Sequence, residues 1–102
     1  QAVLELDELV LGGVPSEFGL NQNYPNPFNP STNISYTVAE KADVQLSIFN
    51  MLGQKVATIV NQSQDAGSYT VSWQAGSMSS GVYIYRLTAG GNTFTKRMML
   101  IK

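Results

Sequence analysis

A run rich in asparagine and proline constrains the fold of this chain more than any other feature. Residues 21–32 read Asn-Gln-Asn-Tyr-Pro-Asn-Pro-Phe-Asn-Pro-Ser-Thr and contain three of the four prolines. Each proline restricts its own φ and disfavours the helical region for the residue before it, so the run is not a helix. Proline also cannot donate to a β-ladder, which excludes the run from the interior of a sheet. We predict a stiff, extended lead-in, with Tyr24 and Phe28 pinning it to an apolar surface.

Beyond this run, apolar and polar residues alternate in the way that is typical of half-buried strands. Gly, Asn and Ser clusters separate the alternating stretches, and no helical period is present. This pattern predicts an all-β fold, an antiparallel immunoglobulin-like β-sandwich of about seven strands without helices of note. Six strands are expected at residues 32–38, 43–50, 54–60, 68–74, 82–89 and 93–101, and a doubtful one at 3–11.

The turns and the core follow from the same pattern. Asn50 to Gly53 is predicted to be a tight hairpin in which Gly53 takes the left-handed conformation, and residues 61–67 are predicted to be a polar loop. Strand 82–89 is apolar on nearly both faces and should be central. We expect Trp73 at the centre of the core. Phe18 and Leu20 are candidates to pack on the rim of the sandwich.

Composition excludes most kinds of chemistry. The 102 residues include no cysteine and no histidine, so thiol nucleophiles, the usual general base and the usual metal ligand are missing. Within the expected sandwich the acids Glu40, Asp43 and Asp65 all fall in or beside turns. We therefore predict no enzyme, no cofactor and no metal site. The net charge of −1 argues against nucleic-acid binding, and no apolar run is long enough to be a direct membrane span.

Charge is unevenly distributed along the chain. All charged side chains among the first seventeen residues are acidic, and all charged side chains among the last seventeen are basic. A Gly-Gly-Val-Pro-Ser-Glu cluster at residues 12–17 indicates a boundary. We expect residues 1–17 to be a linker or a weak first strand from a preceding domain, and residues 18–102 to be the β-sandwich. The chain is interpreted as the C-terminal piece of a longer protein.

Two features leave alternatives open at this point. The apolar stretch from Lys96 to Lys102 is either an ordinary edge strand with protective charges or a strand that a partner recognises. Aromatic residues at alternating positions are either core residues, which is the favoured interpretation, or a platform on which sugars stack. These aromatic residues are Tyr36, Tyr69, Trp73, Tyr83 and Tyr85.

Several motifs, in order, resemble one known family. They are Leu20-x-Gln-Asn-Tyr-Pro-Asn-Pro-Phe-Asn-Pro-Ser-Thr-x-Ile-x-Tyr36, Leu52-Gly-Gln-x-Val56, Ala66-Gly67, Ser80-Gly-Val-Tyr-x-Tyr-Arg-Leu87 and the tail from Lys96 to Lys102. The chain resembles, from about Phe18 to Lys102, the type A C-terminal sorting domain of the type IX secretion system. That domain is related in fold to the immunoglobulin-like domain of flagellar hook-capping proteins.

The resemblance implies a non-catalytic C-terminal secretion signal that directs an N-terminal cargo through the outer-membrane type IX translocon. Implied partners are the translocon, its sortase-like protease and the cargo, with the periplasm in transit and then the cell surface or medium as the location. Cleavage is expected in or before residues 1–17. The positions implied to carry the signal are Pro25, Asn26, Pro27, Phe28, Asn29, Pro30, Gly81, Tyr83, Arg86, Lys96, Leu100 and Lys102.

Two other functions fit the residues alone. The first is a carbohydrate-binding or structural β-sandwich module of a surface enzyme, which would show exposed, coplanar aromatic side chains. The second is an assembly module like the hook-capping domain, which would associate with itself.

Overall fold

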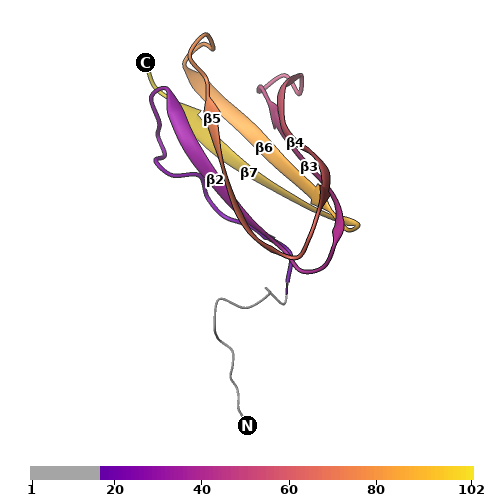
Figure 1. Cartoon of the computed structure of the whole chain (residues 1–102). Helices are drawn as coiled ribbons and strands as arrows, with labels where there is room; N and C mark the ends of the chain where they lie inside the picture. Colours follow the sequence, from indigo (N-terminus) through magenta and orange to yellow (C-terminus); the bar gives the residue numbers. More distant parts are fainter. Residues whose placement is uncertain (1–16) are drawn as a thin grey trace.

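The computed structural model describes residues 17–102, which form two facing antiparallel sheets (Figure 1). One sheet has the order β1-β2-β5 and the other has the order β4-β3-β6-β7. This confirms the predicted antiparallel β-sandwich, and no helix occurs among residues 17–102. The strands are β1 (Gly19–Leu20), β2 (Ser31–Val38), β3 (Ala42–Phe49), β4 (Lys55–Gln64), β5 (Gly67–Gln74), β6 (Gly81–Ala89) and β7 (Asn92–Leu100).

One prediction about the strands was wrong, and another concerns residues outside the described chain. The predicted loop at 61–67 is mostly strand, because β4 continues to Gln64 and pairs with β3 as far as Ala42. β4 is an edge strand of its sheet, so the side chains of Asn61, Gln62 and Ser63 stay exposed while the backbone still pairs. The seventh strand is β1, a two-residue strand paired with β2. The doubtful strand at 3–11 lies outside the described residues.

The predicted core is present, with one change in its layout. β6 lies between β3 and β7, as its double-sided apolar pattern predicts, and Leu87 is fully buried. Trp73 is buried but sits near the end of β5, where it contacts Phe28 and Tyr83 at ring-centre distances of 5.8 and 5.9 Å. Four of the five alternating aromatic residues are buried, and the fifth, Tyr69, is half-buried. They fill the core and do not form an exposed platform.

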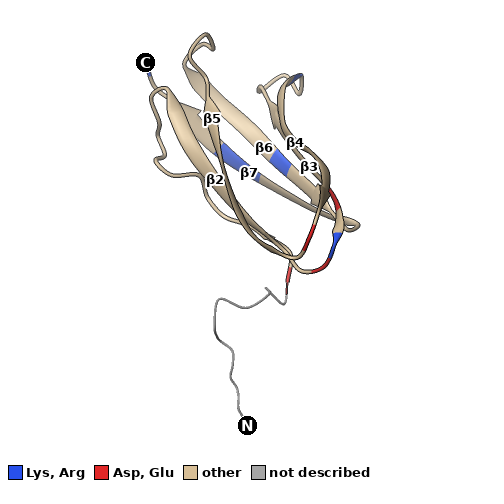
Figure 2. Ribbon diagram, viewed as in Figure 1, with Lys and Arg blue, Asp and Glu red and all other residues tan. Residues whose placement is uncertain are grey.

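The sandwich has two ends of different character. The N-terminal end holds β1 and the β2–β3, β4–β5 and β6–β7 turns, and the C-terminal end holds the β3–β4 turn, the β5–β6 loop and the end of β7 (Figure 1). The acidic residues of the described chain lie on the part of the ribbon toward the N-terminal end (Figure 2). Lys55 and Lys102 lie at the C-terminal end.

Candidate recognition site

The candidate site is built on residues 21–30, called the lead segment below, which joins the two sheets along one side of the sandwich. On one side the lead segment pairs with β2. The Tyr24 and Asn33 backbones exchange two hydrogen bonds of 2.9 Å, and Asn21 N–H donates to the Ser35 carbonyl at 2.9 Å. The prolines do not interfere, because the bonding N–H groups belong to other residues.

On its other side the lead segment bonds to β7, the edge strand of the larger sheet. Phe28 N–H donates to the Met99 carbonyl, and Ile101 N–H donates to the Phe28 carbonyl, both at 2.9 Å. Phe28 thus forms a parallel bridge with Leu100. The C-terminal strand and the Asn/Pro run are therefore bonded to each other through their backbones.

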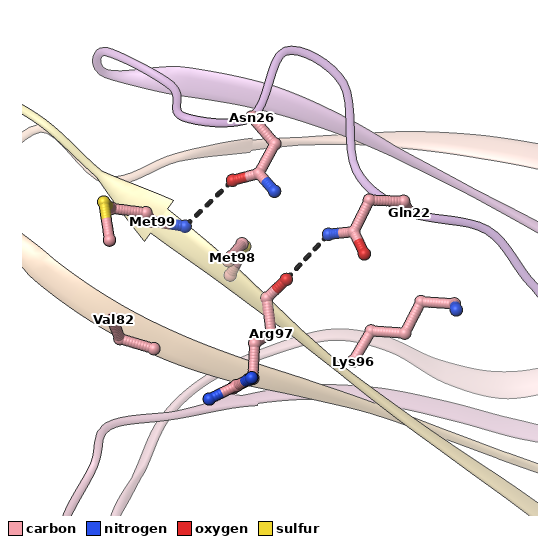
Figure 3. A pocket seen from close by; sticks show the side chains of 7 residues that line it. All are labelled: Gln22, Asn26, Val82, Lys96, Arg97, Met98 and Met99. Carbon is pink, nitrogen blue, oxygen red and sulfur yellow. Dashed lines mark hydrogen bonds between the residues drawn. The ribbon is translucent and has the colours of Figure 1, made fainter.

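Two side-chain amides extend this contact along β7 (Figure 3). Gln22 Nε2 donates to the Arg97 carbonyl at 2.7 Å, and Asn26 Oδ1 accepts from Met99 N–H at 3.0 Å. These backbone groups lie on the outer edge of β7, where a further strand would pair. The amides therefore occupy part of an edge that would otherwise be free for strand addition.

The two aromatic residues of the lead segment differ in burial. Phe28 is 2% exposed and packs on Trp73, so the predicted anchoring of Phe28 is confirmed. Tyr24 is 79% exposed, so its predicted anchoring is wrong. Residues directly opposite each other in an antiparallel pair point to the same face. Tyr24 faces Asn33, whose side chain is exposed, and it therefore points into solvent.

Buried polar groups hold the lead segment in place. The Tyr85 hydroxyl accepts from Asn23 N–H at 2.8 Å and donates to the Asn21 carbonyl at 2.7 Å. Burial raises the pKa of Tyr85, which keeps the phenol neutral and able to make both bonds. The Asn23 side chain also donates to Thr32 Oγ1 at 3.0 Å. Sequence reasoning placed Tyr85 in the core but did not identify this role, since alternation gives the buried face and not the partner.

The chain end is tied to the β5–β6 loop. Lys102 N–H donates to Ser80 Oγ at 3.1 Å, and Lys102 Nζ donates to the Gly76 carbonyl at 2.6 Å. Pro30 joins the same region through its carbonyl, which accepts from Ala75 N–H at 2.9 Å. The last residue is exposed, yet its position is fixed by these contacts.

The structure brings together most of the residues that the resemblance implies. Pro25, Asn26, Pro27, Asn29 and Pro30 are exposed on the lead segment. Phe28 is buried on the same segment, and the other candidates lie on β6, on β7 or just after it. Leu100 is buried opposite Gly81, and buried Tyr83 donates its hydroxyl to the Ser79 carbonyl at 2.7 Å.

Arg86 does not belong to this group. Its guanidinium lies over the Phe49 ring at 4.5 Å, on the outer face of the larger sheet. Its neighbours there include Ser47 and Lys55, which line the same hollow. The lead segment lies along the edge of β7 instead, so Arg86 and the Asn/Pro run face different surroundings.

A groove of about 450 Å³ lies beside β7, between the lead segment and the first residues of β6 (Figure 3). Two amides and two cations line it together with apolar side chains, and its lining includes no carboxylate. The lining residues are Gln22, Asn26, Val82, Lys96, Arg97, Met98 and Met99. Such a surface suits a partner with acidic and apolar groups.

The described residues show neither a metal centre nor a membrane helix. No group of three or more His, Cys, Asp or Glu residues within 17–102 is placed to hold a metal ion. Over the same residues, no helix is long and apolar enough to cross a membrane.

Comparisons with known proteins identify the family and the fold of the chain. Residues 22–102 match the family described as the secretion system C-terminal sorting domain. No curated protein matches the chain. Among solved structures, the chain is similar to dimeric latent PorU from Porphyromonas gingivalis, with a TM-score of 0.60 and 16% sequence identity. The similarity covers 90% of this chain and 10% of that one, so it concerns the fold.

The family match spans the lead segment from Gln22 onward and every strand from β2 to β7. It therefore includes both partners of the contact between the Asn/Pro run and the terminal strand. The chain belongs to the family of secretion system C-terminal sorting domains, the signals that direct proteins through type IX secretion.

Proposed function

We propose that the type IX translocon recognises the lead segment and β7 together, as one surface of the folded domain. The observation that supports this most directly is the bonding between the two segments. Asn26 and Met99, for example, are 73 residues apart in the chain and joined by a hydrogen bond. An unfolded chain does not present this surface, so recognition of it selects domains that have folded.

The remaining parts of the proposal follow from the family. Residues 18–102 are the sorting domain, and residues 1–17 connect it to an N-terminal cargo. The cargo passes through the periplasm before it reaches the cell surface or the medium. A sortase-like protease of the PorU kind removes the domain in or before residues 1–17.

The first experiment measures where a reporter protein goes when Gln1–Lys102 is fused to its C-terminus behind a signal peptide. The hosts are a bacterium with the type IX machinery and its translocon mutant. We expect the reporter on the surface or in the medium of the parent, and in the periplasm of the mutant. A folded fusion that stays in the periplasm of both strains would contradict the sorting function.

The second experiment tests the surface itself. Replacing both groove cations, Lys96→Gln with Arg97→Gln, removes charge from a half-buried and an exposed position without deleting any core residue. We expect lower export of the reporter with an unchanged thermal midpoint. Lys41→Gln makes the same kind of charge change in the β2–β3 turn at the opposite end and should leave export unchanged. Equal export of the unaltered fusion, the double variant and the Lys41→Gln variant would show that the translocon does not recognise the groove.

A truncation is a weaker test of the same idea. Deleting residues 98–102 removes buried Met98 and Leu100, together with Met99 and Ile101, the backbone hydrogen-bond partners of Phe28. Loss of export would then combine unfolding with loss of recognition. The charge variants separate the two effects.

A further inference from the structure

The β3–β4 turn presents two large apolar side chains outside the sandwich. Met51 is 61% exposed and Leu52 is 83% exposed, and neither contributes to the core. They lie at the C-terminal end, at the tip of the hairpin between β3 and β4 (Figure 1). The turn contains the first residues of the Leu52-Gly-Gln-x-Val56 motif. This motif takes no part in the contact between the lead segment and β7.

Hydrogen bonds fix this turn in one conformation. Asn50 Oδ1 accepts from Leu52 N–H at 2.9 Å and from Gln54 N–H at 3.0 Å. Gly53 N–H donates to the Asn50 carbonyl at 3.0 Å, and Gly53 has a φ of 83°. The backbone that carries the two apolar side chains is thus ordered before any partner binds. A rigid protrusion loses less conformational entropy on binding than a flexible one.

The end of the sandwich that carries the turn indicates the chemistry of its partner. Lys55 begins β4 directly after the turn. The exposed apolar residues Met99 and Ile101 lie at the same end, with Lys102, but on or just after β7, at the opposite edge of the larger sheet from β4. The acidic residues of the described chain lie toward the other end (Figure 2). The complement of this end is an apolar cavity with carboxylates at its rim.

We propose that the Met51–Leu52 turn inserts into such a cavity on a protein of the translocon, as a contact separate from the lead segment and β7. The inference rests on the proposed sorting function and adds a second contact to it. A second copy of this chain is a poorer partner. The two hollows described on this molecule are lined by basic residues, Lys96 with Arg97 and Lys55 with Arg86, which would repel Lys55 of another copy.

The test uses two double variants of the full fusion. Met51→Ser with Leu52→Ser removes the apolar tip, whereas Met51→Leu with Leu52→Met exchanges the two residue types and keeps the apolar surface. Because both side chains are exposed, neither double variant should shift the thermal midpoint of the purified chain. We expect the serine variant to lower the export rate about tenfold or more, and the exchange variant to retain parental export.

The possible outcomes separate this inference from the proposed function. If the unaltered fusion is not exported, the sorting function and the inference fail together. If the unaltered fusion and the serine variant are exported equally, only the inference fails. Loss of export in the exchange variant, where the apolar surface remains, would also contradict it.

A photoreactive amino acid at position 52 identifies the partner during export. We expect a cross-link to one translocon protein, within a peptide that combines apolar and acidic residues. A cross-link to a second copy of the chain, with self-association of the purified domain that the serine variant abolishes, would assign the turn to a homodimer and overturn the proposal. Binding of the purified chain to lipid vesicles that the serine variant abolishes would overturn it as well.

Discussion

The hairpin turns at the two ends of the sandwich differ in whether the rest of the protein packs against them. In the β6–β7 turn at the N-terminal end, Gly90 has a φ of 57°, and a Cβ there would lie 2.8 Å from Phe18 Cζ. In the β3–β4 turn at the C-terminal end, Gly53 has a φ of 83°, and a Cβ there would have nothing within 4 Å. The first turn is closed by a side chain of the protein itself, and the second is open to solvent.

Each end also has its own aromatic cluster. Tyr36 and Tyr69 stack at 5.4 Å toward the N-terminal end, and Phe28, Trp73 and Tyr83 pack together toward the C-terminal end. The C-terminal end therefore combines a buried cluster that holds the lead segment with an exposed apolar turn. Apolar residues at that end therefore fall into two classes. The buried aromatic residues stabilise the fold, and the exposed residues of the turn are available to contact a partner.

The largest effect is expected from removing the centre of the C-terminal cluster. Trp73→Ala should lower the free energy of unfolding by about 3–5 kcal/mol, because it leaves a cavity between Phe28 and Tyr83. Chemical denaturation measures this loss. Amide exchange at Phe28 and Ile101 should also become faster, since Phe28 loses its support. Tyr24→Ala, at an exposed aromatic residue, serves as control, and equal losses in the two variants would contradict the division into classes.

A smaller effect is expected at the closed turn. Gly90→Ala should cost about 1–3 kcal/mol, because the new methyl group meets Phe18 and the positive φ disfavours a residue with a Cβ. A double-mutant cycle with Phe18→Ala separates the two causes. If the contact matters, Gly90→Ala costs less in the Phe18→Ala background. An equal cost in both backgrounds would leave backbone strain as the sole cause.

The open turn should respond through its backbone alone. Gly53→Val should cost about 1 kcal/mol or more, since a β-branched residue resists positive φ although space is available. Gly53→Asn should cost less, because asparagine tolerates the left-handed region. Thermal unfolding of the two variants provides the comparison. An unchanged midpoint for Gly53→Val would contradict the role of positive φ in this turn.

The smallest effect on stability is expected at the last residue. Lys102→Ala removes one exposed hydrogen bond, from Nζ to the Gly76 carbonyl, and should change stability by less than about 0.5 kcal/mol. Export of the reporter should nevertheless fall if the terminal lysine is part of the recognised surface. Normal export with normal stability would remove Lys102 from the set of signal residues.

Alternation predicted the strands well, except where a strand needs no apolar face. Residues 32–38 were found because they bury one side of a regular two-residue pattern, and residues 82–89 were found because a run that is apolar on nearly both faces indicates a central strand. The extension of β4 through Asn61 and Gln62 was missed, since an edge strand can pair its backbone while its polar side chains stay in solvent. The resemblance supplied the candidate signal residues, and the structure showed that Arg86 lies apart from the lead segment.

The sequence by itself determined the all-β class, the extended course of the Asn/Pro run and the left-handed glycine at position 53. These features depend on neighbours in the chain, through proline geometry, the two-residue period and the penalty on Cβ at positive φ. Only the tertiary structure decided that Phe28 is buried while Tyr24 is exposed, and that Gln22 and Asn26 bond to β7. These outcomes depend on how the lead segment lies against the edge of β7. That contact joins groups more than 70 residues apart in the chain, so no local pattern predicts it.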